Sequence, residues 1–294
     1  MRSSRLGMTE GVSRQFSKEK SLELFSKICR CRDFEKNAAK AYDEKLIQRI
    51  PLYLSLGQES VSVGLSMALP EAKQFGQHRC HDIYICWGGN LRTLRDELLG
   101  LLTGCAGGMG GSASIHSPTA GMFGHDGLMG TQIPIAVGYA LGSGNVTIAI
   151  MGDASAEEGY VLGAIGEAAS KKAPILFVCY DNNLSILTEI SARRSWSMVD
   201  EARAKKIPAI DITDDPWLVM HYANKFKNDL PAFINVRTCR ELWHAGTGCD
   251  GPPEWNRYKL VKKEMATLGL EKEVETIEKT TQEYIDSIWN ERRH

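Results

Sequence analysis

Two polar segments of this 294-residue chain each follow an apolar run, and together they could hold a metal ion. Asp153 comes shortly after the run 146–151, and Asn183 follows the run 175–180, 30 residues beyond Asp153. This spacing is about one strand–helix–strand unit, which would bring both side chains to the same edge of a parallel sheet. Carboxylate and amide oxygens suit Mg²⁺, which often completes its shell with water and substrate phosphates. Because Ser155 would open a helix whose N-terminus favours an anion, the sequence predicts a metal-diphosphate site.

These residues also have a plainer structural interpretation. Asp153 and Ser155 could simply cap a helix, and the segment 181–183 could form a turn. A glycine-rich tract nearby favours a ligand, because nine of the 27 residues from 104 to 130 are glycine. Glycine is needed where a backbone must approach a ligand closely. Taken together, the three features favour the diphosphate site.

Alternating strands and helices are predicted to position this site. The strands are expected at 146–151, 175–180, 207–212 and 232–237, and the helices between them at 156–172 and around 221–226. This alternation implies right-handed crossovers and a mostly parallel sheet with helices on both faces. The expected fold class is therefore α/β.

Apolar spacing predicts further helices outside this alternating region. They are expected at 17–45, directly after Gly57, at 91–102, and as one amphipathic helix from 260 onward. No repeat or linker divides the chain. We expect a flexible N-terminal arm over 1–16 and a single domain over 17–294, with helical additions at both ends.

Composition excludes several classes of protein. The hydrophobic share of 43% is enough for a substantial core, and the net charge of -1 gives no general attraction to nucleic acid or to an anionic membrane. The longest apolar runs are far shorter than the ~20 residues of a membrane-spanning helix. The first residues do not lead into the apolar core of a secretory signal. A soluble, cytoplasmic protein with eight reduced cysteines is expected.

Several tracts resemble one enzyme family and occur in that family's order. They read LSLGQESVSVGLSMAL, WGGNLRTLRDELLGLLTGCAGGMGGSASIH, FGHDGLMGTQIPIAVGYAL, GDASAEEG followed by YDNN, and RTCRELWHAG. The GDASAEEG and YDNN pair resembles the thiamine-diphosphate fingerprint, a GDG and an NN separated by a crossover helix. Over residues 18 to 260 the chain resembles the alpha subunit of 2-oxo acid dehydrogenases such as pyruvate dehydrogenase. This implies the diphosphate-binding domain of the thiamine-diphosphate-binding fold.

The resemblance implies how a metal and a diphosphate would be held. Asp153, Asn183 and the backbone carbonyl of Ser185 would bind Mg²⁺, which bridges the two phosphates of thiamine diphosphate. His78 and Arg79 stand where the family has a Tyr-Arg pair that reaches the diphosphate. An arginine fork suits phosphate oxygens.

The same resemblance implies the remaining coenzyme contacts. The backbones of Gly127 and Met129 would face the aminopyrimidine, and Leu187 would wedge the coenzyme into its bent form. Ala154 and Ser155 complete the predicted cofactor-binding residues. Ala154 stands where the fingerprint has glycine, and alanine would cost on the order of 1 kcal/mol if the backbone there had a positive φ.

Two histidines, His81 and His244, are predicted to be catalytic by the resemblance, because the family's counterparts lie near the reactive thiazolium carbon. Both could instead be packing residues. Residues 78–82 could also supply transition-metal ligands, although alternate and adjacent residues rarely converge on one ion without a second cluster.

The resemblance implies an enzyme that decarboxylates a 2-oxo acid, pyruvate above all, and passes the acyl group to a lipoyl arm. Its coenzyme-activating glutamate would come from a beta-type subunit, in an expected α2β2 assembly that could also bind a lipoyl acyltransferase. Glu59 is not that glutamate, because its tract resembles the alpha subunit's own GQE segment. The alternatives are the N-terminal half of a split transketolase-like enzyme, or a non-catalytic paralogue that binds a beta-type partner.

Overall fold

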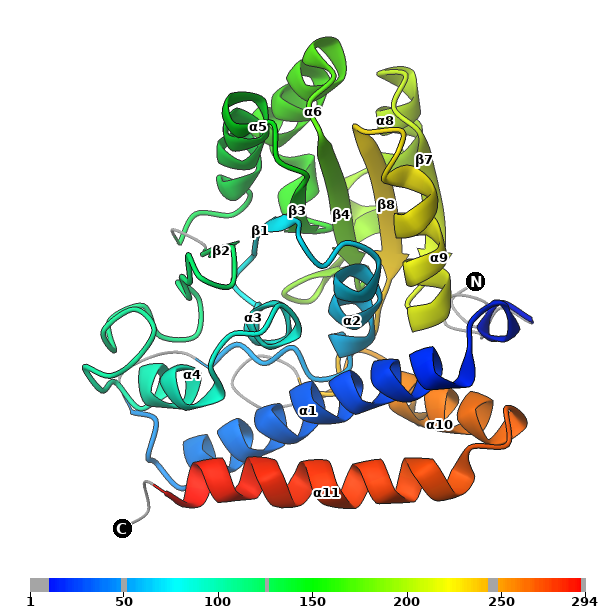
Figure 1. Ribbon diagram of the computed structural model, residues 1–294. Helices are drawn as coiled ribbons and strands as arrows, with labels where there is room; N and C mark the ends of the chain where they lie inside the picture. The colour runs from blue at the N-terminus through cyan, green and yellow to red at the C-terminus, as the bar shows by residue number, and fades with distance from the viewer. Residues whose placement is uncertain (1–10, 49–51, 125–126, 243–247, 292–294) are drawn as a thin grey trace.

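The computed structural model describes residues 11–48, 52–124, 127–242 and 248–291. A six-stranded sheet runs through the centre in the order β2-β1-β3-β4-β8-β7 (Figure 1). Every neighbouring pair in this sheet is parallel. The strands are β1 (Lys73–Phe75), β2 (Met122–Phe123), β3 (Thr147–Gly152), β4 (Ile175–Asp181), β7 (Ala209–Thr213) and β8 (Ala232–Arg237). The predicted α/β fold with a mostly parallel sheet is confirmed.

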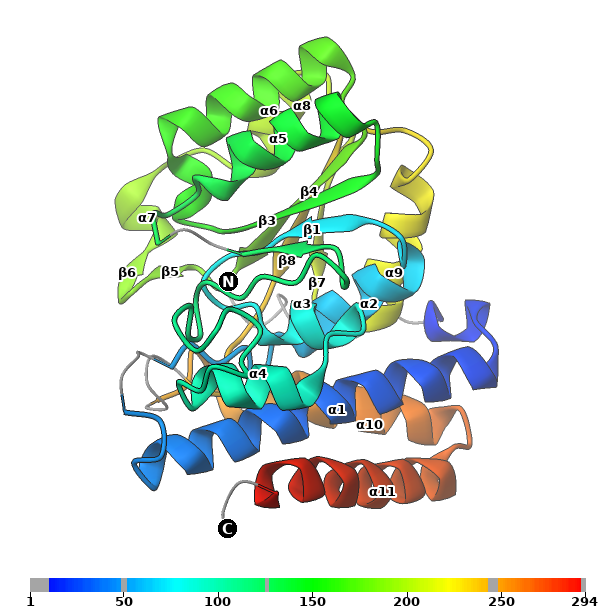
Figure 2. The same cartoon turned by 60° about the vertical axis from the view of Figure 1, so that its left-hand side comes forward.

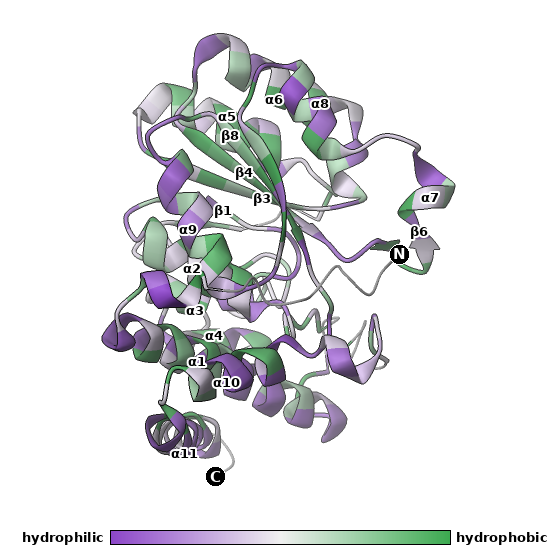
Figure 3. Ribbon diagram, turned by 90° about the vertical axis from the view of Figure 1, so that its right-hand side faces the viewer, coloured by the Kyte–Doolittle hydropathy of each residue, from purple (hydrophilic) through white to green (hydrophobic). Residues whose placement is uncertain are grey.

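The sheet is buried on both faces, and its apolar strands fill two separate cores. Along β3, Ile148 and Ile150 point into one core while Ala149 and Met151 point into the other, as the two-residue period of a strand requires. Figure 3 shows the apolar strands enclosed by helices whose outer surfaces are hydrophilic.

Different helices cover the two faces (Figure 2). One face carries α5 (Gln132–Ser143), α6 (Gly159–Lys171) and α8 (Met198–Ala204). The opposite face carries α2 (Glu59–Ala68) and α9 (Pro216–Phe226). Beyond α2 lie the terminal helices α1 (Lys18–Asp43), α10 (Arg257–Thr267) and α11 (Glu271–Asn290), with α1 and α11 side by side. The predicted helical additions therefore form an outer layer on this side.

Several predicted helices differ in detail from those in the structure. The helix expected at 91–102 is α4 (Leu91–Leu98), and the preceding α3 (His81–Cys86) was not predicted. The single helix expected from 260 onward is wrong: Gly269 adopts φ +69, a left-handed conformation that ends α10 and separates it from α11. A short 3₁₀-helix at Ser13–Gln15 occupies the end of the expected flexible arm.

The segment after β3 also begins differently from its prediction. Ser155 opens a 3₁₀-helix, Ser155–Glu157, and α6 begins only at Gly159. After β4 comes a small hairpin of β5 (Leu184–Ser185) and β6 (Thr188–Glu189), followed by α7 (Ile190–Arg193). Within the described ranges, no helix has the length and apolar character needed to cross a membrane.

Candidate active site

A cleft of about 410 Å³ lies at the carboxyl edge of the sheet. Four adjacent strands, β1, β3, β4 and β8, each lead into residues that line it. These residues include Gln77, His78 and Arg79 after β1, Asp153 and Ala154 after β3, Asn182 and Ser185 after β4, and Arg240 after β8. In the sheet, β1 and β3 flank the point at which the strand order reverses direction. Ligands of open parallel sheets bind at such a point.

Asp153 provides the negative charge of the cleft. Its buried carboxylate accepts from Arg193, while Arg194 donates to its backbone carbonyl at 3.0 Å. Burial and the charge of Asp181 raise the pKa of Asp153 to about 7, against the opposing effect of Arg193. A buried carboxylate in this setting requires a cation beside it, and Arg193 is the cation that it contacts.

Ala154 fits its position without strain. Its backbone has φ −77, so the cost expected for a positive φ does not arise. The departure from glycine therefore leaves the shape of the turn after β3 unharmed.

Two buried arginines, Arg79 and Arg240, provide the positive charge of the cleft. Arg79 donates to the carbonyl of Leu54 at 3.0 Å, and Arg240 forms a two-pronged contact with Asp250 at 2.6 and 2.8 Å. Burial, followed by the charge of Arg240, lowers the pKa of Arg79 to about 9. An anion entering the cleft would relieve the repulsion between the two guanidinium groups, so the cleft suits a phosphate-bearing ligand.

The rest of the cleft lining includes open space beside Gly127 and, among the described residues, one unused hydrogen-bond acceptor, the side-chain oxygen of Gln58. His78 lies edge-on to Tyr53, with 5.0 Å between ring centroids. Gly127 has φ +100, and a Cβ built there would meet nothing within 4 Å, so the backbone borders open space. Met129 lines the same cleft. The buried Oε1 of Gln58 accepts no hydrogen bond from the described part of the chain, which leaves it open to a ligand donor or water.

Three predicted cofactor-binding residues do not line this cleft. Asn183 borders a neighbouring cavity, whereas the adjacent Asn182 lines the cleft. Leu187 and Ile186 are both exposed, and of the two only Ile186 lines the cleft. Ser155 is buried and donates to the carbonyl of Gly152 at 3.0 Å. The assigned contacts of Asn183, Leu187 and Ser155 stay predictions.

The structure describes only one of the two predicted catalytic histidines. His81 is fully buried away from the cleft lining, with Nδ1 3.0 Å from Glu35 and Nε2 2.8 Å from the hydroxyl of Ser112. His244 lies outside the described residues. Catalysis by either one stays a prediction. Among the residues that the structure describes, no three His, Cys, Asp or Glu side chains form a metal-binding group, so nothing supports the transition-metal interpretation of 78–82.

Several cleft residues were missed by sequence reasoning. They are Tyr53, Gln58, Gln77, Ala113, Gly152, Tyr180, Asn182, Leu184, Ile186 and Arg240. Position relative to a strand end could have identified some of them, since Gln77 adjoins His78 and Asn182 adjoins Asn183. In the sequence, Tyr53 and Gln58 do not follow any of these strands. They precede α2, and no local pattern identifies them as cleft residues.

The protein is therefore of the α/β class, with a cleft at the carboxyl edge of its parallel sheet that suits a phosphate-bearing ligand. The chain belongs to a family described as the dehydrogenase E1 component, which matches residues 26–237.

The relatives agree with this family. The alpha subunit of the mitochondrial pyruvate dehydrogenase E1 component from Chaetomium thermophilum is 32% identical, over 67% of this chain and 49% of its own length. The corresponding subunit of Rhizobium meliloti is 31% identical, over 62% of this chain and 53% of its own length. That of Saccharomyces cerevisiae is 25% identical, over 94% and 70% respectively. The match to the first two thus spans about half of their length.

Proposed function

We propose that this chain is the alpha-type subunit of a heteromeric, thiamine-diphosphate-dependent 2-oxo acid dehydrogenase. The substrate would be pyruvate, and the acyl group would pass to a lipoyl arm. The observation that carries the proposal is the meeting of Arg79, Asp153 and Arg240 in one cleft, each placed by a different strand of the sheet. The similarity to pyruvate dehydrogenase alpha subunits supports this choice of substrate.

The cleft fits thiamine diphosphate with Mg²⁺. The guanidinium of Arg79 would bind phosphate oxygens, and the carboxylate of Asp153 would hold the metal together with oxygens of the loop after β4. The open acceptor of Gln58 and the space beside Gly127 would accommodate the organic part of the coenzyme. The bound coenzyme supplies the carbanion-stabilising chemistry, while the protein supplies binding, orientation and proton transfer.

The chain's own residues would orient the ligand and exchange protons. His78 lies in the cleft against Tyr53, where an imidazole can hold or release a proton near neutral pH. His81 would act through Ser112, which also accepts from the backbone N–H of Tyr53 at 2.9 Å. His81 would therefore help to place Tyr53 at the cleft wall.

The site is proposed to need a beta-type subunit. Of the described residues that line the cleft, Asp153 is the one carboxylate, and the proposal assigns it to the metal. Glu59 is buried against Arg32 and does not line the cleft. A glutamate that activates the aminopyrimidine would have to come from a second chain, as in the α2β2 assembly proposed above. A lipoyl acyltransferase as a further partner and a cytoplasmic location are part of the same proposal.

A direct test compares the isolated chain with the chain assembled with its beta-type partner. With Mg²⁺ and thiamine diphosphate supplied, the pair should decarboxylate pyruvate and the isolated chain should not. Turnover by a verified single-chain preparation would refute the need for a partner. A pair that binds coenzyme without turning over any 2-oxo acid would support the non-catalytic alternative, and activity on ketose phosphates would support the transketolase-like one.

A further inference from the structure

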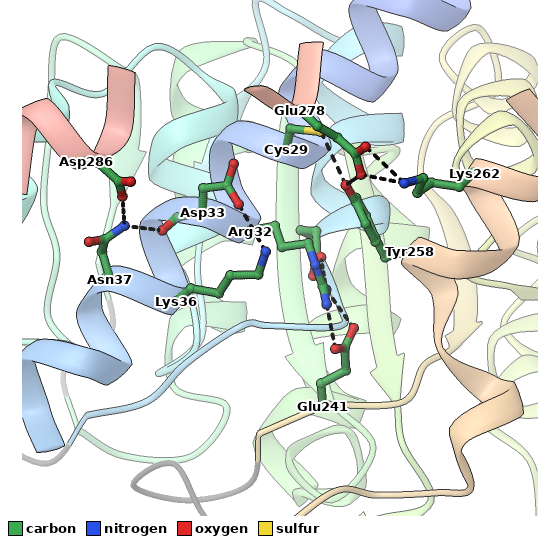
Figure 4. Close-up of polar contacts among 11 residues, drawn as sticks. Cys29, Arg32, Asp33, Lys36, Asn37, Glu241, Tyr258, Lys262, Glu278 and Asp286 are labelled. Atoms are coloured by element: carbon green, nitrogen blue, oxygen red, sulfur yellow. Dashed lines mark hydrogen bonds and ion pairs between the residues drawn. The ribbon is translucent and has the colours of Figure 1, made fainter. Parts of the chain in front are cut away.

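One arginine of the outer helical layer, Arg32, contacts two segments that lead to the cleft. Arg32 of α1 is buried, and its two terminal nitrogens donate to the two carboxylate oxygens of Glu241 at 2.6 Å each (Figure 4). The same guanidinium donates to Glu59 at 3.1 Å and stacks over the ring of Tyr258 at 4.5 Å. Arg32 therefore joins α1, the start of α2, the segment after β8 and the start of α10.

The segments joined by Arg32 also contact each other directly. The backbone N–H of Glu241 donates to the carbonyl of Leu56 at 2.9 Å, and the side-chain amide of Gln58 donates to the hydroxyl of Thr238 at 2.8 Å. Gly57 has φ +95, and a Cβ there would lie 2.6 Å from the carbonyl oxygen of residue 239. The contact is thus close enough to require glycine, and residues 56–59 pack directly against 238–241.

Two residues of the cleft wall belong to the segments that meet in this contact. Arg240 and Gln58 both line the cleft, and each is adjacent in sequence to a carboxylate that Arg32 holds. Burial raises the pKa of Glu59 to about 7. Arg32 opposes this shift, and the charge of Glu241 adds to it. Without the guanidinium, the buried carboxylate of Glu59 and the partly exposed carboxylate of Glu241 would repel each other beside the cleft wall.

We infer that Arg32 is a positioning residue: by clamping Glu59 and Glu241 it fixes Gln58 and Arg240 in the cleft. The clamp itself follows from the contacts above, whereas the ligand whose binding it serves rests on the proposed function. A displacement of only about 1 Å of a group that positions the substrate can lower the reaction rate by as much as about 100-fold.

The test uses Arg32→Lys, which keeps the charge but loses the two-pronged contact, and Glu241→Gln, which keeps the shape but loses the charge. The control is Arg95→Lys. Arg95 is also buried, and it also bridges two carboxylates, Asp96 and Glu291, but it joins α4 to the end of α11. All variants are studied in the assembled enzyme.

Two measurements decide the inference. Calorimetry with thiamine diphosphate and Mg²⁺ should show about 10-fold weaker binding for each clamp variant, with a double variant little worse than either single one, because both remove one interaction. Hydrogen exchange should rise across 239–242 in the clamp variants. Arg95→Lys should change neither quantity, whatever it does to the thermal midpoint.

Unchanged exchange at 239–242 and coenzyme affinity within 2-fold of the parent would overturn the inference, even if the variants were less stable. If the parent enzyme itself bound no thiamine diphosphate, the proposed function would fail. Exchange at 239–242 would then decide the clamp alone.

Discussion

The molecule contains two arginine–carboxylate sites that resemble each other in chemistry but differ in surroundings. At the cleft, Asp153 contacts Arg193, whose side chain keeps 14% of its exposure and comes from the short α7 after a hairpin. Behind the cleft, Glu241 and Glu59 contact Arg32, which extends from the middle of the 26-residue α1. If the first arginine moves away, Arg194 still lies beside Asp153, whereas the second arginine is shared by two carboxylates and packs among several elements. The comparison suggests that Asp153 can exchange its cation for a metal and that the buried clamp cannot exchange at all.

The largest expected effect is on stability, from removal of the buried cation. Arg32→Met would leave the buried Glu59 beside the partly exposed Glu241 without a countercharge, and an uncompensated buried charge typically costs about 3–5 kcal/mol. Arg193→Met should cost less, because Arg194 still lies beside Asp153 and provides a second cation. Thermal unfolding of the assembled variants measures both. Equal losses would contradict the distinction between a fixed and an exchangeable site.

The next effect concerns ligand binding at the exchangeable site. Asp153→Asn should weaken Mg²⁺-dependent binding of thiamine diphosphate by about 100-fold, because the proposed metal site would lose its one charged protein ligand. Calorimetry on the assembled enzyme is the measurement. Glu157→Gln is the matched control, since Glu157 pairs with Arg193 and Arg194 but does not line the cleft. Equal affinity in Asp153→Asn and the parent would remove Asp153 from the metal site.

These two sites also show how far sequence reasoning reaches. Asp153 was found because it directly follows a buried strand, and the edge of a parallel sheet gathers such residues whatever the rest of the chain does. The strand runs themselves are local patterns, and β3, β4, β7 and β8 were predicted closely.

The clamp had no comparable signal. Arg32 and Glu241 are 209 positions apart, and nothing in either segment identifies the other. The placement of Asn183 beside the cleft and of Asn182 in its lining has a similar origin. Asn183 has a left-handed backbone, with φ +66, at the turn into the hairpin, and spacing along the sequence does not predict this conformation.

A smaller effect follows from competition at Asp153. If Arg193 must leave before a metal binds, Arg193→Met should bind Mg²⁺ and thiamine diphosphate more tightly than the parent. If loss of this competing pair returns about 1 kcal/mol to metal binding, the affinity should rise roughly 5-fold. Arg203→Met provides a control, because Arg203 forms an exposed pair with Asp200 on α8. Weaker binding in Arg193→Met would show that Arg193 assists the ligand instead of competing with it.

The smallest expected effect is a pH dependence that belongs to the fixed site. Burial raises the pKa of Glu59 from its ordinary value of 4.5 to about 7, although Arg32 opposes the shift. A carboxyl group with a raised pKa in the folded state stabilises the fold below its unfolded pKa, and that contribution is lost as the pH rises toward the folded pKa. Glu59→Gln cannot ionise, so its thermal midpoint relative to the parent should improve by a few degrees between pH 4.5 and pH 8. Arg32 still contacts Glu241 in this variant, which keeps the clamp partly intact. A difference between variant and parent that stays constant over this range would mean that Glu59 remains ionised throughout, with Arg32 fully compensating its burial.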